Sequence, residues 1–187
     1  MPLCYGGGVR SVDMLERIVQ LGVEKVALSS AAVRTPELIS AAAERVGSQS
    51  IVAVMDVKKT GILRRWEAFT HNGTRKTGLD PVDFARQAED RGAGEIVFNN
   101  IDRDGEMGGY DLDLIRPVRE AVHLPLTVLG GARSLAHIEA LIHEFGIIGA
   151  AAGSLFVFKG VYRAVLINYP NRQEKDDLLA RAGFGAL

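Results

Sequence analysis

Short apolar runs alternate with longer amphipathic stretches along this chain. The six apolar runs lie at residues 2–5, 25–28, 51–55, 95–98, 124–129 and 149–153. Each run is continuous rather than alternating, which is typical of parallel strands that are buried on both faces. Strand and helix signals alternate six times, so the pattern predicts an α/β fold with a parallel sheet. Since no linker or low-complexity segment divides the chain, we expect one domain over residues 1–187.

Helix start signals stand between the apolar runs. Thr35-Pro36 and Asp80-Pro81 each combine a capping residue with proline at the first helical position. Ser11 and Ser134 are predicted to cap the helices that follow two glycine pairs. Residues 173–182 are polar and predict a closing helix.

One internal repeat indicates how the strands are arranged. Residues 2–11 (PLCYGGGVRS) match residues 125–134 (PLTVLGGARS) at an offset of 123 residues. A (βα)₈ barrel, also called a TIM barrel, typically has about 250 residues, so this offset is near half a barrel. The repeat therefore predicts two related half-barrels. Because six strands are found, we expect strands 3–8 of the barrel to be present and its first two βα units to be missing.

Composition narrows the possible partners and compartments. The chain has 22 basic and 23 acidic residues, so it lacks the charge excess of a nucleic-acid-binding protein. Its single cysteine cannot form an internal disulfide, which favours a reducing cytoplasm. No apolar run approaches the roughly 18 residues that indicate a membrane span. The four histidines show no metal-ligand spacing, and we expect neither a metal nor a cofactor.

The glycine pairs are candidate phosphate sites. Each follows a strand and precedes a helix, where backbone N–H groups can converge on an anion. Small residues end the next strand of each half and could add hydroxyl and amide donors. The candidates are Gly7, Gly8, Ser29 and Ser30 in one half, and Gly130, Gly131, Gly153 and Ser154 in the other. The alternative is that the glycines only make tight turns, but the repetition favours two opposed sites for a ligand phosphorylated at both ends.

Acidic residues after the strands are candidate catalytic groups. Asp56 follows an apolar run, a position that is typically catalytic at the C-terminal face of a barrel. Asp102 and Asp104 could position a substrate with Arg103 as their partner, or could form a salt-bridged turn. Asn99 could donate a hydrogen bond into the site. The basic residues between positions 58 and 76 are expected in a long loop, which either attracts an anionic substrate or is simply solvated.

Several motifs together resemble one known family. They include GGGVRS at residues 6–11, IDRDG at residues 101–105 and GYD at residues 109–111. This chain resembles the cyclase subunit of imidazole glycerol phosphate synthase from residue 1 to about residue 169. The resemblance implies a (βα)₈ barrel that takes ammonia from a glutaminase partner. It also implies conversion of a bis-phosphorylated ribulosyl aminoimidazole carboxamide ribotide to imidazole glycerol phosphate and aminoimidazole carboxamide ribotide, as in histidine biosynthesis.

The resemblance also assigns roles to single residues. Asp56 matches an acid/base aspartate, and Lys25 and Glu95 match charged gate residues where ammonia enters the barrel. The residues that match the two phosphate sites are Gly8, Ser29 and Ser30, and Asp104, Gly105, Gly131, Gly153 and Ser154. The family's other catalytic aspartate lies on the first strand, within the units expected to be missing. We therefore expect negligible turnover from residues 1–187 alone.

Some positions depart from the histidine-pathway pattern. Ser29, Asn99 and Leu129 stand where asparagine, threonine and serine are usual. The segment 153–170 is more similar to a paralogous branch found in bacterial surface-polysaccharide clusters, whose members help to put nitrogen on a sugar. Three functions remain open: a histidine-pathway cyclase, an ammonia-conducting subunit for sugar amidination, and a non-catalytic fragment that binds phosphates or a partner.

Overall fold

A curled parallel sheet forms the centre of the molecule. The computed structural model describes residues 2–160 and 162–184. The parallel strands, in spatial order, are β1 (Cys4–Gly6), β2 (Lys25–Leu28), β3 (Ile51–Thr60), β6 (Glu95–Asn100), β7 (Leu126–Leu129) and β8 (Gly149–Ala150). The predicted α/β fold with a parallel sheet is confirmed, and the curled sheet fits a TIM-barrel-type fold. The predicted absence of the first two barrel units stays a prediction.

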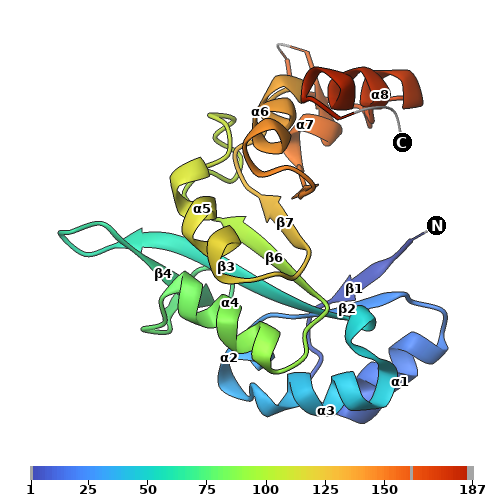
Figure 1. The fold of residues 1–187 in the computed structure, drawn as a ribbon, viewed down its shortest axis with the longest axis vertical. Helices are drawn as coiled ribbons and strands as arrows, with labels where there is room; N and C mark the ends of the chain where they lie inside the picture. Colours follow the sequence, from blue (N-terminus) through green and yellow to red (C-terminus); the bar gives the residue numbers. More distant parts are fainter. Residues whose placement is uncertain (1, 161, 185–187) are drawn as a thin grey trace.

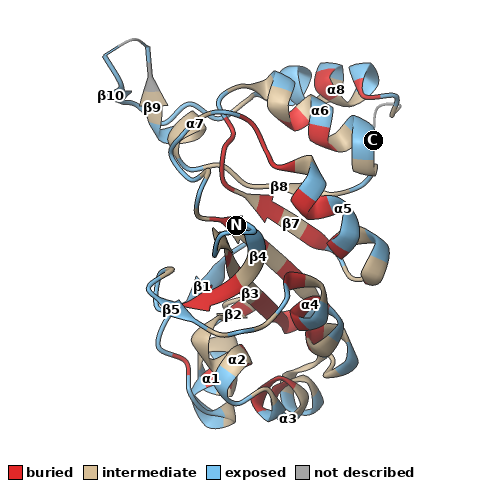
Figure 2. Ribbon diagram, turned by 90° about the vertical axis from the view of Figure 1, so that its left-hand side faces the viewer, coloured by how far each residue is buried: buried red, intermediate tan, exposed pale blue. Residues whose placement is uncertain are grey.

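Helices follow the strands and cover the outside of the sheet (Figure 1). They are α1 (Val12–Gln20), α2 (Ser30–Arg34), α3 (Glu37–Val46), α4 (Pro81–Asp90), α5 (Leu112–Ala121), α6 (Leu135–Phe145), α7 (Ser154–Val157) and α8 (Arg172–Arg181), with a 3₁₀ turn at Ser48–Ser50. Buried residues gather on β3, on β7 and on the helix faces turned toward the strands (Figure 2). The closing helix begins and ends within one residue of its predicted bounds.

The two faces of the strands are buried to different degrees. Along β6, buried side chains such as Ile96 and Phe98 alternate with half-buried ones such as Glu95 and Val97. Strand β2 alternates in the same way, with Lys25 on the half-buried face. The prediction that both faces of every strand are buried is therefore wrong. Helices cover one face, whereas the interior face stays partly accessible and carries the polar side chains.

Two of the four predicted helix caps, Asp80 and Ser11, form side-chain cap bonds, and the other two, Ser134 and Thr35, do not. The Asp80 carboxylate accepts a hydrogen bond from the Val82 amide at 2.8 Å, with Pro81 at the first helical position. The Ser11 hydroxyl accepts one from the Met14 amide at 3.3 Å. Ser134 precedes α6 without a side-chain cap bond. Thr35 does not cap α3, because that helix begins at Glu37 and Pro36 occupies the capping position.

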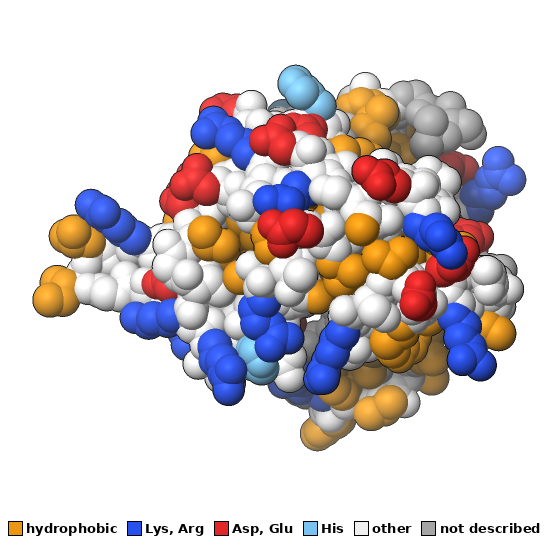
Figure 3. All heavy atoms as spheres, turned by 90° about the horizontal axis from the view of Figure 1, so that it is seen from below, with side chains coloured by type: hydrophobic (Ala, Val, Ile, Leu, Met, Phe, Trp, Pro, Cys, Tyr) orange, Lys and Arg blue, Asp and Glu red, His pale blue; other side chains and the backbone are white. Residues whose placement is uncertain are grey.

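A β-hairpin replaces the long loop that was expected after Asp56. Strand β3 runs on to Thr60 and pairs antiparallel with β4 (Arg65–Thr70), which in turn pairs with β5 (Arg75–Lys76). The hairpin projects from the body of the protein, and apolar and basic side chains gather at its tip (Figure 3). Ile62 is fully exposed there and Leu63 is mostly exposed. A second, short hairpin of β9 (Phe158–Lys159) and β10 (Ala164–Val165) was also not predicted.

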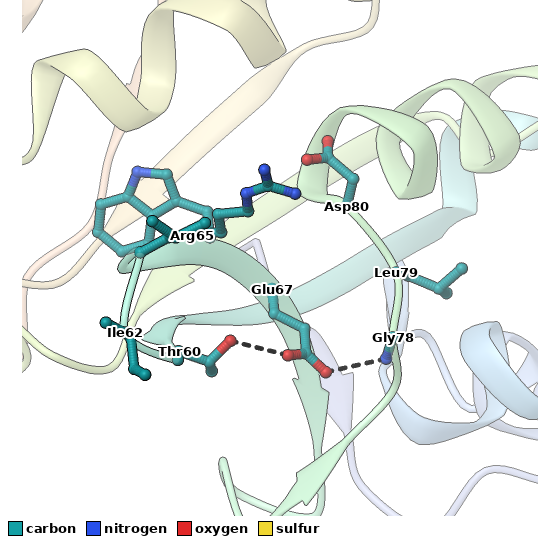
Figure 4. Close-up of a pocket in the computed structure, with 10 residues that line it drawn as sticks. Thr60, Ile62, Arg65, Glu67, Gly78, Leu79 and Asp80 are labelled. Carbon is teal, nitrogen blue, oxygen red and sulfur yellow. Dashed lines mark hydrogen bonds between the residues drawn. The ribbon is translucent and has the colours of Figure 1, made fainter.

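Glu67 links the end of β3, next to the hairpin turn, to the segment that follows β5. One carboxylate oxygen of Glu67 accepts from the Thr60 hydroxyl and the other from the Gly78 amide, both at 2.9 Å (Figure 4). These residues line a cavity of about 800 Å³ under the hairpin. Desolvation raises the pKa of Glu67, but the bonds from Gly78 and Thr60 and the charge of Lys76 outweigh it, so the pKa lies below its ordinary value.

In the described part of the chain, no helix is both long enough and apolar enough to cross a membrane.

We predict that Glu67→Gln destabilises the protein at pH 7 but has little effect at pH 3. Because folding lowers the pKa of Glu67, the ionised carboxylate stabilises the fold above the ordinary value of 4.5, and this contribution is lost as the pH falls through the folded value. Urea midpoints of wild type and variant measure the difference at each pH. The exposed Glu106→Gln is the matched control. A difference that persists unchanged at pH 3 would contradict this explanation.

Candidate functional site

Both glycine pairs lie at the C-terminal edge of the sheet. Gly7-Gly8 follows β1, and Gly130-Gly131 follows β7. Because these strands belong to one parallel sheet, their C-terminal ends share an edge. The predicted common placement of the two glycine pairs is therefore confirmed.

The first glycine pair opens onto a cavity of about 280 Å³, here called the N-terminal glycine cavity. A Cβ atom added at Gly7 or Gly8 would meet no other atom within 4 Å, so the backbone there is accessible to a ligand. The residues that line the cavity are Gly7, Gly8, Val9, Arg10, Ala27, Leu28, Ser29, Ser30, Ala31, Arg34, His71 and Asn72. The fold thus brings together the four predicted residues of this half and adds two arginines.

The second glycine pair is packed against the chain. A Cβ atom at Gly130 would lie 2.5 Å from the carbonyl oxygen of Asn100, and one at Gly131 would lie 2.1 Å from that of Gly109. The Gly109 amide also donates to the carbonyl oxygen of Gly131 at 2.8 Å. Gly130 and Gly131 therefore allow the loop after β6 to pack closely against them, a role that the sequence did not predict.

The other predicted residues of this half are spread over neighbouring connections. Asp104 and Gly105 are exposed on the loop after β6. Gly153 and Ser154 follow β8, and Ser154 is the first residue of α7. Strand β7 lies between β6 and β8, so all of these residues follow adjacent strands.

Arg103 holds the loop after β6 in a way that the sequence did not reveal. Its guanidinium donates to the Gly109 carbonyl at 3.0 Å and pairs with the Asp111 carboxylate at 3.3 Å. Asp102 instead accepts from the Lys59 amide of the hairpin at 2.8 Å. The expected pairing of Arg103 with Asp102 and Asp104 is therefore wrong. Asp111, eight residues after Arg103, is buried and attracts the guanidinium more strongly than the exposed Asp102 and Asp104 do.

Tyr110 ties the same loop to Ala151, the residue that follows β8. Its hydroxyl donates to the Ala151 carbonyl at 2.9 Å, and burial raises the pKa of Tyr110 to about 12. Tyr110 therefore stays protonated, and keeps this bond, throughout the neutral range. The GYD motif marked Tyr110 and Asp111 but gave no indication of these contacts.

Asp56 and Asn99 form a hydrogen-bonded pair on the interior face. They are register partners on β3 and β6, and the Asn99 amide donates to Asp56 Oδ1 at 2.9 Å. Asp56 lies within β3 rather than at its end, although the pairing of β3 with β6 stops one residue later, at Val57. The side-chain oxygen of Asn99, Oδ1, is buried and has no hydrogen-bond partner among the described residues.

A second polar cluster lies at the opposite edge. Lys25 Nζ and Glu95 Oε2 are 2.5 Å apart, and the Thr127 hydroxyl donates to Glu95 Oε1 at 2.7 Å. The predicted gate residues are thus in contact, and Thr127 is an addition that the sequence did not suggest. Cys4 lies in register with Lys25. Desolvation and the Glu95 carboxylate raise the pKa of Cys4, whereas Lys25 opposes this rise.

Within the described residues, no group of three or more histidine, cysteine, aspartate or glutamate side chains is placed to hold a metal ion.

Comparison with known proteins identifies the family. A family model described as "Histidine biosynthesis protein" matches residues 1–163. The chain belongs to this histidine biosynthesis family. It is 52% identical over 178 residues to a Leptospira interrogans protein provisionally named imidazole glycerol phosphate synthase subunit HisF, covering 95% of this chain and 70% of the relative.

Other relatives agree with this membership of the histidine biosynthesis family. A Vibrio vulnificus (strain YJ016) protein, provisionally named imidazole glycerol phosphate synthase subunit hisF3, is 54% identical over 96% of this chain and 69% of its own length. The imidazole glycerol phosphate synthase subunit HisF of Myxococcus xanthus (strain DK1622) is 49% identical over 78% of this chain and 57% of its own length. The expected resemblance to HisF-type subunits is confirmed, whereas a particular closeness to the polysaccharide branch stays a prediction.

The contrast between the glycine pairs predicts unequal costs of substitution. Gly8→Ala should lower the free energy of unfolding by about 1 kcal/mol, because the only penalty is a left-handed backbone. Gly131→Ala should cost about 3 kcal/mol or more, because a clash with Gly109 is added to the same strain. Urea denaturation measures both values. Equal costs would show that the first pair is packed as tightly as the second.

Alkylation of Cys4 tests the charges around it. Lys25→Met removes the cation that lowers the Cys4 pKa, so less thiolate forms and iodoacetamide should react more slowly at pH 8. Glu95→Gln removes the opposing carboxylate and should accelerate the reaction. Lys58→Met, on the hairpin, is the matched control and should leave the rate unchanged. If Lys25→Met and Glu95→Gln changed the alkylation rate in the same direction, the two charges would not act on Cys4 in the opposing ways described here.

Proposed function

We propose that this protein is an ammonia-using cyclase subunit of imidazole glycerol phosphate synthase. Its substrate is the bis-phosphorylated ribulosyl aminoimidazole carboxamide ribotide, and its ammonia comes from a glutaminase partner. The proposal rests on how polar side chains are arranged on the interior face of the sheet. Lys25 and Glu95 occupy its N-terminal edge, Asp56 and Asn99 its C-terminal edge, and the register-paired Val54 and Val97 lie between.

Asp56 is the proposed acid/base group. Its carboxylate is oriented by the amide of Asn99 at 2.9 Å, which leaves the second carboxylate oxygen for a proton of ammonia or substrate. A positioned carboxylate of this kind typically contributes a factor of about 100 to 10,000 to the rate. Asn99 acts here as a positioning residue through Asp56.

The two phosphates are proposed to bind on either side of this pair. The N-terminal glycine cavity supplies open backbone at Gly7 and Gly8, hydroxyls at Ser29 and Ser30, and two guanidinium groups nearby. For the other phosphate we propose Gly131, Gly153 and Ser154, with Asp104 and Gly105 on the loop that Arg103 and Tyr110 hold. A ligand that reaches from one half to the other must pass over the C-terminal edge of the sheet, where Asp56 lies.

Ammonia is proposed to enter past the Lys25–Glu95 pair, with the glutaminase docked on that edge. Glu95 is held by Thr127 and its side chain is 15% exposed, whereas the Lys25 side chain is 42% exposed. Lys25 is therefore the partner that moves when the passage opens.

Asp56→Asn tests the proposed chemistry. Because the resemblance assigns the second aspartate to an earlier strand, the assay uses a protein in which the first two βα units of the Leptospira interrogans relative precede residue 1. Ammonia-dependent turnover should fall at least about 100-fold, with substrate affinity nearly unchanged, since asparagine keeps the size but cannot transfer the proton. Asp90→Asn on the outside of α4 is the matched control. Undiminished turnover in Asp56→Asn would remove this residue from the mechanism.

Sugar amidination in surface-polysaccharide synthesis is the second candidate. Asn99 and Leu129 both depart from the histidine-pathway pattern. Asn99 is the register partner of Asp56, and Leu129 is the register partner of Asn99 on the next strand, β7. Ser29, the third departure, lines the N-terminal glycine cavity. A substrate of different shape beside the acid would account for all three. The same extended protein distinguishes the two candidates. Turnover of the ribotide supports the histidine-pathway cyclase. A lack of turnover with intact ligand binding favours the sugar-amidination subunit.

A further inference from the structure

The turn between β4 and β5 lies over the N-terminal glycine cavity. His71 and Asn72 line this cavity, although they are far along the chain from the glycine pair. The backbone amide of His71 reaches the Ser30 hydroxyl at 3.4 Å. The hairpin therefore contributes to the cavity from a segment that no motif had associated with it.

The backbone of this turn has an unusual conformation. His71, Asn72 and Gly73 have φ angles of 54°, 54° and 74°, so three consecutive residues are left-handed. For a residue other than glycine, this conformation costs on the order of 1–3 kcal/mol, and such strain clusters where ligands bind. The Thr74 hydroxyl donates to the His71 carbonyl at 2.7 Å and helps to hold the turn.

The side chains of the turn offer hydrogen-bond donors. His71 Nδ1 is 3.1 Å from the Thr70 hydroxyl, and this contact orients the ring and leaves Nε2 for another partner. The Ser30 hydroxyl accepts from the His71 amide and keeps its own proton to donate. The Asn72 amide adds a further donor, and Arg10 and Arg34 make the cavity cationic. Donors and cations of this kind match a phosphate dianion.

We propose that His71 and Asn72 bind the same phosphate as Gly7, Gly8 and Ser30, and are specificity-determining residues of the N-terminal glycine cavity. The inference rests on the proposed function in taking the ligand to be a phosphate. It goes further by making the hairpin part of the site, so that phosphate is enclosed from β1, β2 and β4 together.

A titration of the protein with inorganic phosphate, followed by ¹H–¹⁵N spectra, tests the proposal. The amides of Gly7, Gly8, Ser30 and His71 should shift together with one dissociation constant. Asn72→Gly removes the amide side chain, and His71→Asn removes the imidazole. Glycine and asparagine both tolerate a left-handed backbone, so the turn is preserved. Each variant should weaken binding severalfold, and the double variant about tenfold or more.

Arg64→Asn is the matched control. Arg64 also has a left-handed backbone, with φ of 46°, and belongs to the other turn of the same hairpin, outside the cavity. Arg64→Asn should leave unchanged the dissociation constant for phosphate measured at the Gly7 and Gly8 amides. Urea midpoints of all variants verify folding, and Asn72→Gly alone carries the test if His71→Asn is unfolded.

The outcomes separate this inference from the proposed function. In one outcome, phosphate shifts the Gly7 and Gly8 amides with the same dissociation constant in the double variant as in wild type. That result would overturn the role of the turn and leave the phosphate site intact. A wild-type protein in which phosphate shifts neither Gly7 and Gly8 nor Gly130 and Gly131 would overturn the proposed function as well.

Discussion

The register between β3 and β6 determines where the chemistry can lie. The two strands pair in parallel from Val52 and Glu95 up to Val57 and Asn100. Side chains alternate between faces with a period of two, so this register places Glu95, Val97 and Asn99 on one face and Ile96 and Phe98 on the other. A slip of one residue would turn Glu95 and Asn99 toward the helices and bury them without partners.

The two glycine pairs of the repeat differ in what occupies the space beside them. At Gly7-Gly8 no other atoms stand near the missing side chains, and the space is a cationic cavity closed by the β4–β5 turn. At Gly130-Gly131 the corresponding space is filled by the backbone of the loop after β6. That loop is held by the pairing of Arg103 with Asp111 and by the bond from Tyr110 to Ala151. Gly130 and Gly131 therefore tolerate substitution less well than Gly7 and Gly8 do.

Sequence patterns predicted the elements whose signals are local. The strand at Lys25–Leu28, the first four residues of the strand at Glu95–Asn100 and the cap at Asp80 depend on neighbouring residues, so apolar runs and capping residues were sufficient. The hairpin was missed because Lys58, Lys59, Arg64 and Arg65 look like a solvated loop. The strand pairing there depends on Glu67, which bonds to Thr60 and Gly78. Contacts between distant segments, such as Asn99 with Asp56 or His71 with Ser30, leave no periodic signal, so only the fold revealed them.

We propose that one ligand, phosphorylated at both ends, lies across the C-terminal edge of the sheet above the Asp56–Asn99 pair. A crystal structure with a bis-phosphorylated, unreactive analogue of the ribotide tests it most directly. One phosphate should bind at Gly7, Gly8 and Ser30 and the other near Gly131 and Ser154, with the middle of the ligand within hydrogen-bond distance of Asp56. A ligand that binds elsewhere, or whose two phosphates both lie on one side of Asp56, would contradict it.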